Sequence, residues 1–252
     1  MSCQEESRSV PKAGRIFTER ELQDFSKDCM DLALEAIDDG DLEKARYWCR
    51  REAETKNLTH DVFVDWLAAL CSFICEQNGE ETVVQVIREL MVAKICNAEF
   101  VAAKQALIEK EGLKAWVTWC IDLARQHHSY PGLTVAEDDE KIIITLNPCG
   151  SGGRLIDAGR FEGEQGYSKL RKPGPHTWGE TDIPVYCVHC PLAQEIIPIE
   201  LGGQGAQLWV HASPFPRKAG DPCIHYFYKN LADIPEEYYE RLGMKKAGSK
   251  DS

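Results

Sequence analysis

The sequence has no proline between Pro11 and Pro131 and only three glycines between residues 15 and 131. Proline disrupts helix interiors, so its absence favours long helices over this part of the chain. Thr18-Glu-Arg-Glu21 fits a capping box at the start of the first helix. Apolar residues recur at helical spacing, and glycine or asparagine falls where each segment would end. The expected helices cover residues 18–40, 41–57, 59–79, 80–97, 99–111 and 113–128.

The sequence also lacks a long uninterrupted apolar run and an apolar leader. No apolar run approaches the roughly 20 residues that span a bilayer. Residues 1–20 are polar and charged, without the apolar core of a signal peptide. We therefore expect a cytoplasmic protein that does not enter a membrane.

Positive charge is scarce. The chain has 29 Lys and Arg against 41 Asp and Glu, which gives a formal net charge of −12. Nucleic acid requires a basic face, so the sequence predicts no nucleic-acid partner. A small anionic molecule is the expected ligand, and the sequence leaves a homo-oligomer open.

The composition changes near residue 130, since eleven of the 12 prolines lie beyond it. Between these prolines lie short runs of β-type residues, and these runs predict strands. The expected strands are Lys141–Leu146, Pro184–Val188, Gln207–Ala212 and Ile224–Lys229, with short helices at Leu192–Ile197 and Pro235–Leu242. The fold class expected is α+β, a helical bundle (18–130) followed by a small, mostly antiparallel sheet domain (131–246) with a cysteine metal site. Disordered tails are expected at 1–17 and 247–252.

The eleven cysteines fall into two kinds. Six lie within helical patterns, where cysteine packs as a small hydrophobe, and Cys3 lies in the polar tail. The other four lie in turns rich in glycine and proline: Cys149, Cys187, Cys190 and Cys223. Cys187-Val-His-Cys190 has the spacing with which one tight turn directs two thiolates at one ion. Four sulfurs predict tetrahedral zinc, with an iron–sulfur cluster or no metal as the alternatives.

The number of sulfur ligands decides between a structural and a catalytic metal. Four cysteines usually close a structural zinc site, whereas catalytic zinc keeps a position for water or substrate. His189 and His225 could replace a sulfur or transfer protons, although a structural role is the commoner one for each. Glu195 follows Cys190 by five residues and is a candidate general base.

The segment Gly150-Ser151-Gly152-Gly153-Arg154 offers consecutive flexible amides, a hydroxyl and a guanidinium beside Cys149. Such a nest suits a carboxylate or phosphate, although a plain flexible turn is an equal interpretation. His176 and Trp178 lie in a long loop, Glu162–Gly179, that could cover a pocket. These seven residues are the expected substrate-binding set.

The segment Gly220-Asp-Pro-Cys-Ile-His-Tyr-Phe-Tyr resembles the last strand motif of four-vinyl-reductase-like small-molecule-binding domains and of L-2-amino-thiazoline-4-carboxylate hydrolase-like proteins. The resemblance covers about 40 residues, from Cys187 to Lys229, and departs from that motif in the Asn147–Arg154 loop and in Cys-Val-His-Cys. It implies an α+β domain with a pocket and a metal-associated cysteine set, and it permits catalysis or ligand sensing.

Two function classes follow from these features. The first is a zinc-dependent hydrolase or lyase that acts on a small anionic substrate. The alternative is a small-molecule-sensing or partner-binding module whose zinc or iron–sulfur site is structural.

Overall fold

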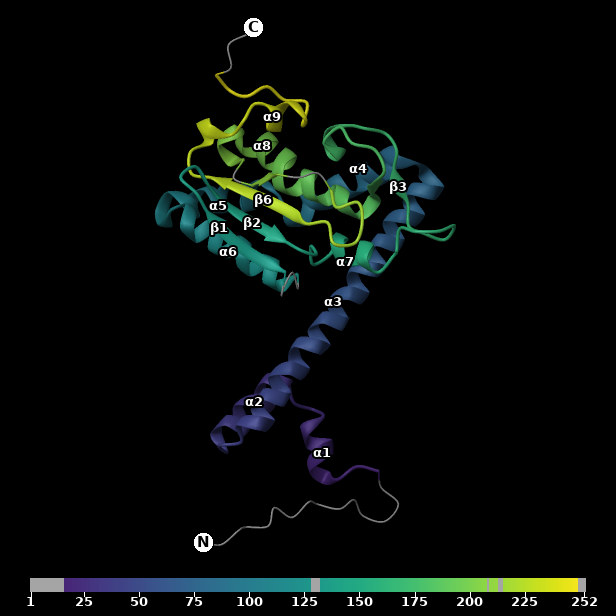
Figure 1. Cartoon of the computed structure of the whole chain (residues 1–252), viewed down its shortest axis with the longest axis vertical. Helices are drawn as coiled ribbons and strands as arrows, with labels where there is room; N and C mark the ends of the chain where they lie inside the picture. Colours follow the sequence, from purple (N-terminus) through teal and green to yellow (C-terminus); the bar gives the residue numbers. More distant parts are fainter. Residues whose placement is uncertain (1–15, 128–131, 208, 213–214, 249–252) are drawn as a thin grey trace. The chain divides into compact units, whose positions relative to one another are not determined.

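The computed structural model describes residues 16–127, 132–207, 209–212 and 215–248, so most of both expected tails, with Cys3, lies outside the described residues. The fold is mixed α+β, with a long helical N-terminal region followed by a small antiparallel sheet of four strands (Figure 1). The chain divides into two compact units, Met1–Thr59 and His60–Ser252.

The first unit contains α1 (Glu19–Asp24), α2 (Cys29–Asp38) and the beginning of α3 (Leu42–Asn78). The predicted capping box is confirmed, because the Thr18 side chain and the Glu21 side chain each accept a hydrogen bond from the other's backbone amide. The single helix expected to reach Gly40 is two helices. Asp28 accepts a hydrogen bond from the amide of Met30 and so caps a new helix.

Helix α3 runs through Asn57, where the sequence predicted a break. No glycine or proline occurs between Gly40 and Gly79, so no helix-breaking residue ends α3 before Gly79. By length and composition alone it is the one helix of the described residues that could cross a membrane, where none was expected. A single helix of this length and composition is also found as a core helix in water-soluble proteins.

The second unit begins within α3 and continues with α4 (Glu80–Leu90), a π-helical turn η1 (Met91–Ile95), α5 (Ala98–Glu111) and α6 (Leu113–Gln126). The apolar stripe of α6 packs against the sheet, where Trp116 and Cys120 share a core with Ile144 and Phe227. The sequence placed a domain boundary at residue 130, whereas the compact units divide at Thr59 because α4–α6 bury their apolar faces against the sheet part of the chain.

The sheet has the strand order β1-β2-β6-β5, and all its pairs are antiparallel. Its strands are β1 (Leu133–Glu137), β2 (Lys141–Leu146), β6 (Cys223–Tyr228) and β5 (Val210–His211). The predicted strand Lys141–Leu146 is confirmed, and Ile224–Lys229 is confirmed to within one residue. The predicted strand Pro184–Val188 is wrong beyond Pro184, because Val185–Val188 forms a 3-10 turn, η3. Only β4 (Ile183–Pro184) pairs there, with β3 (Lys169–Leu170).

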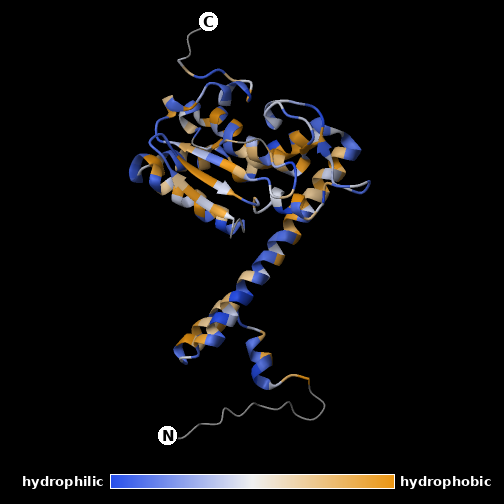
Figure 2. Cartoon of the chain, viewed as in Figure 1, coloured by the Kyte–Doolittle hydropathy of each residue, from blue (hydrophilic) through white to orange (hydrophobic). Residues whose placement is uncertain are grey.

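Short elements complete the second unit. They are α7 (Gly152–Asp157), η2 (Pro175–Thr177), η4 (a π-helical turn, Pro191–Ile196), α8 (Ile197–Gly202), η5 (Gln204–Ala206), η6 (Leu231–Asp233) and α9 (Glu237–Glu240). Residues of α4, η4 and α8 form a second core, which includes Val83, Ile196 and Ile197. Figure 2 shows apolar residues on these elements and on the strands.

Candidate metal centre

The pairing of β2 with β6 brings two of the predicted ligands together. Leu146, the last residue of β2, lies opposite Cys223, the first residue of β6. Cys149 follows Leu146 by three residues, and the side chains of Cys149 and Cys223 are hydrogen-bonded to each other. The single cysteines, 74 positions apart in the sequence, are thus neighbours because of strand register.

The turns η3 and η4 position Cys187, His189 and Cys190. The Nδ1 atom of His189 donates to the Tyr186 carbonyl oxygen over 2.6 Å. A carbonyl can only accept, so Nδ1 carries the proton and Nε2 is the basic nitrogen. That Nε2 atom lies 3.5 Å from the sulfur of Cys190. The histidine inside the Cys-x-x-Cys turn therefore presents a proton acceptor to one of the thiols.

The loop that leads into α7 lies close against two thiols. A Cβ atom on Gly152 would stand 2.5 Å from the sulfur of Cys187, and one on Gly153 would stand 3.1 Å from the Cβ atom of Cys149. The amides of Ser151 and Gly153 also donate hydrogen bonds to the Cys149 side chain. The amide nest expected for an external anion is thus directed at a sulfur of the protein itself.

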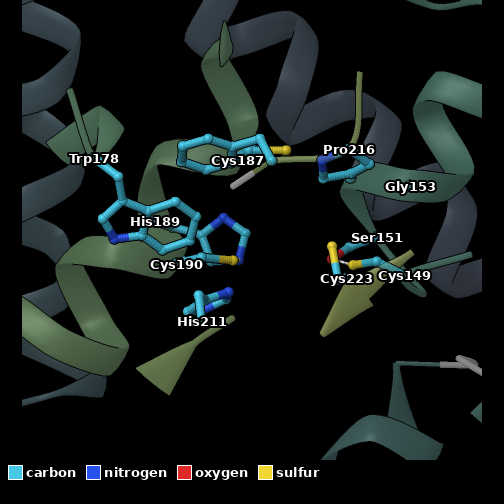
Figure 3. A pocket seen from close by; sticks show the side chains of 12 residues that line it. Cys149, Ser151, Gly153, Trp178, Cys187, His189, Cys190, His211, Pro216 and Cys223 are labelled. Carbon is cyan, nitrogen blue, oxygen red and sulfur yellow. Dashed lines mark hydrogen bonds between the residues drawn. The ribbon is translucent and has the colours of Figure 1, made fainter. Parts of the chain in front are cut away.

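The four cysteines line one pocket, and we call them the pocket cysteines. Figure 3 shows Cys149, Cys223 and Ser151 on one side of this pocket and Trp178 with His211 on the other. The pocket is small, with a free volume of about 20 Å³. This volume has room for an ion or about one water molecule. The lining residues are Cys149, Ser151, Gly152, Gly153, Trp178, Cys187, His189, Cys190, His211, Phe215, Pro216 and Cys223.

The thiols share the pocket without converging on one point. Within the described residues, no three side chains of His, Cys, Asp or Glu stand at the spacing that would hold a metal ion. Ligation by all four sulfurs therefore requires the cysteine side chains to rotate toward a common centre. The metal site stays a prediction, and the structure adds that its four expected ligands border one small space.

The thiols differ in electrostatic environment. The hydrogen bond from Cys223, with those from Gly153 and Ser151, holds the pKa of Cys149 well below its usual range despite burial. Donating that hydrogen bond raises the pKa of Cys223 well above its usual range. Burial likewise raises the pKa values of Cys187 and Cys190. These opposite shifts favour a thiolate at Cys149 over the other three thiols.

Glu195 lies behind the pocket and is fully buried. Its carboxylate accepts hydrogen bonds from the indole of Trp178 (3.1 Å), the backbone amide of His211 (2.7 Å) and the guanidinium of Arg241 (2.8 and 3.1 Å). Burial raises the pKa of Glu195 to about 7, against the lowering effect of Arg241. Both oxygens are thus engaged within the protein, and the predicted general base does not border the pocket.

The two strand histidines differ in their relation to the pocket. His225 and His211 lie opposite each other on β6 and β5, with ring centroids 4.4 Å apart, but only His211 borders the pocket. His225 accepts a hydrogen bond from the indole of Trp209 at Nδ1 (2.8 Å), and its buried Nε2 atom has no partner among the described residues. Burial lowers the pKa of His225 to about 3, so its ring is neutral. His211 was not expected, because no local pattern marks it and the pairing of β5 with β6 brings it beside the pocket.

The predicted substrate-binding residues are only partly brought together. Trp178 borders the pocket in a left-handed conformation (φ 51°), stacked on Phe215 with ring centroids 4.5 Å apart. His176 is half-buried outside the pocket. Arg154 points to α3, where its Nε and Nη2 atoms bind both carboxylate oxygens of Asp61. The expected covering loop is packed through Leu170 and Thr177, both fully buried.

Comparison with models of protein families, with curated proteins and with solved structures gave no match.

Proposed function

We propose that the pocket binds one metal ion, zinc in the first place, with ligands drawn from the four pocket cysteines and one coordination position left to water or substrate. In this proposal the protein is a hydrolase or lyase that acts on a small anionic substrate. The observation that carries the proposal is the meeting of four cysteines from three separate segments at one pocket. Thiolates prefer soft or borderline ions, and four of them in tetrahedral geometry select zinc or an iron–sulfur cluster.

The size, lining and accessibility of the pocket support the proposal that it binds a metal ion. Its free volume of about 20 Å³ suits an ion, and the lining includes two histidines besides the sulfurs. Cys149, Cys190 and Cys223 are only half-buried, so an ion can reach them from solvent. The ten described cysteines are all free thiols, as proteins of the reducing cytoplasm usually keep them.

The catalytic part of the proposal depends on His189. Its basic Nε2 atom borders the pocket, which is where an acceptor for a proton of metal-bound water has to lie. Glu195, whose two oxygens bind protein donors, would orient the pocket wall rather than take that proton. The anionic character of the substrate rests on the sequence pattern Gly150–Arg154.

A second candidate function is a sensing or partner-binding module with a structural zinc or an iron–sulfur cluster. The small free volume favours it, because an ion held by four sulfurs would fill the space and leave none for a substrate. The aromatic walls formed by Trp178 and Phe215 would then serve to exclude water from the metal centre.

Elemental analysis of protein purified without oxygen, with a visible spectrum, tests the metal. We expect about one zinc per chain and no colour, whereas an iron–sulfur cluster is brown. Cys190→Ser should lose the metal and lower the melting temperature, because metal binding is coupled to folding. Cys49→Ser is the matched control, since Cys49 is exposed on α3 and should leave the metal in place. Wild-type protein without metal would refute the proposal.

Cobalt substitution separates the two candidate functions. Anions such as phosphate or small carboxylates should alter the cobalt spectrum if a coordination position is open to substrate. His189→Ala should then keep the metal and lose turnover with any substrate found. A spectrum that no anion alters would instead favour the structural metal.

A further inference from the structure

Six large apolar side chains between residues 62 and 73 of α3 are strongly exposed. Their exposed fractions range from 47% to 68%. The six are Val62, Phe63, Trp66, Leu67, Leu70 and Phe73, and we call them the α3 stripe. Figure 2 shows apolar residues recurring along this helix.

The α3 stripe occupies one side of the helix. At about 100° per residue its members fall within an arc of roughly 140°. The opposite side carries Val64 and Ala68, which are buried in a core with Leu155, Ile156 and Phe161. The helix is therefore anchored to the second unit by one apolar face and presents another that the described chain does not cover.

The area of the stripe is that of a protein interface. Side chains of this size at one-half to two-thirds exposure present on the order of 100 Å² each, so the six together present roughly 600 Å². Apolar patches of soluble monomers rarely exceed a few hundred Å². A standard protein–protein interface buries about 800 Å² per partner, close to what this stripe supplies.

The spacing of the stripe fits a second helix. Phe63, Trp66, Leu70 and Phe73 follow one another at intervals of three, four and three residues, the repeat that packs between two helices. The positions that flank this repeat are also uncharged, namely Val62, Leu67, Ala69 and Ile74. Charges at flanking positions are what direct a helix to a different partner, so an uncharged seam suits pairing with its own copy.

A membrane surface fits the stripe less well. Helices that lie on membranes carry lysine and arginine on the polar face, but none occurs between Lys56 and Arg88. The polar face of α3 instead presents Asp61 and Asp65, which form ion pairs with Arg154 and Arg160. A net charge of −12 would also repel anionic lipid.

We propose that the α3 stripe pairs with the α3 stripe of a second copy of this chain, forming a homodimer. This interface does not depend on the proposed metal function. It involves neither the pocket nor its lining residues, so failure of one proposal leaves the other intact.

Light scattering with size-exclusion chromatography of the full chain tests the dimer. We expect twice the 28.4 kDa mass of one chain at high concentration, with dissociation on dilution. Trp66→Glu, at a side chain 66% exposed, should weaken the dimer about 30-fold or more, as central interface tryptophans do. Circular dichroism should show an unchanged fold, because the substituted side chain lies outside the cores.

Val135→Glu is the matched control, because Val135 is 48% exposed on β1 and should not affect the dimer. A chain that stays monomeric at every concentration would overturn the proposal, as would a dimer that Trp66→Glu leaves intact. A monomer that binds phosphatidylcholine vesicles through Trp66 would overturn it in favour of a membrane surface. A monomer whose melting temperature is lowered by Trp66→Glu would overturn it too, because the α3 stripe would then be buried by other residues of the same chain.

Discussion

At the scale of single residues, the loop at Gly152 leaves no room for a side chain beside Cys187. A Cβ atom there would stand 2.5 Å from a sulfur at the end of a short, buried side chain. We predict that Gly152→Ala lowers the free energy of unfolding by about 1–3 kcal/mol, the usual cost of overpacking. It should also reduce metal content, because Cys187 would be displaced.

Thermal unfolding and elemental analysis on one preparation check this prediction. Gly205→Ala is the control, since a Cβ atom at Gly205 meets nothing within 4 Å and its backbone is not left-handed. Equal melting temperatures and metal contents for the two variants would show that the loop has room to move away from Cys187.

The residues of the pocket were predictable where a local pattern marks them. The pocket cysteines stand in glycine- and proline-rich turns, unlike the six in helices, and all four border the pocket. Trp178 was found for the same reason. His211 was not, because only the pairing of β5 with β6 brings it there. The role of Arg154 was also hidden, since its partner Asp61 lies 93 positions away.

At the scale of elements, Glu195 joins four parts of the second unit. It lies on η4 and accepts hydrogen bonds from Trp178 after η2, from His211 on β5 and from Arg241 after α9. The folded-state pKa is about 7, against 4.5 for the ordinary carboxyl. Between these values the folded protein binds more protons than the unfolded chain, so the free energy of unfolding falls as pH rises from 4.5 to 7.

The pH dependence is tested by comparing wild type with Glu195→Gln. The stability of wild type relative to the variant should fall by up to about 3 kcal/mol as the pH rises between the two pKa values. Denaturant unfolding across that range measures the difference, which cancels pH effects common to both proteins. A difference that stays constant, or that grows with pH, would show that Arg241 keeps the carboxylate ionised throughout.

The elements themselves were predictable where local signals agree with packing. Glycine at positions 40, 79 and 112 ends or separates helices as expected, with positive φ at each. The segment Val185–Val188 has β-type residues but forms a 3-10 turn, because the Cys-x-x-Cys sequence turns toward the pocket. The strand β1 was missed because it is short and its residues are largely exposed.

At the scale of the whole molecule, periodicity identifies helices but not the surface against which they pack. The sequence grouped all helices before residue 130 into one bundle, whereas α4, α5 and α6 contribute to cores that also contain residues of the sheet part. Composition changes near 130 because turns begin there, and the compact units divide instead at Thr59. The predicted boundary at residue 130 stays a prediction, and the long-range burial that groups these helices with the sheet is not recorded by any local pattern.

All residues of the three hydrophobic cores follow His60 in the sequence. We therefore predict that a fragment of residues 55–252, which keeps one helical turn before His60, folds by itself. Its melting temperature should lie within about 4 °C of the full chain, a difference of about 1 kcal/mol for this length. The fragment should also keep the metal and the dimer, because the pocket and the α3 stripe both lie within it.

Circular dichroism, metal analysis and light scattering of the fragment measure these properties together. Because the α3 stripe shares no residue with the pocket or with the cores, the oligomeric state can change without loss of the fold or of the metal. A folded fragment that is monomeric would mean that residues 1–54 contribute to the dimer contact. A fragment that unfolds far below the full chain would mean that burial within His60–Ser252 is insufficient, and that the first unit stabilises the second.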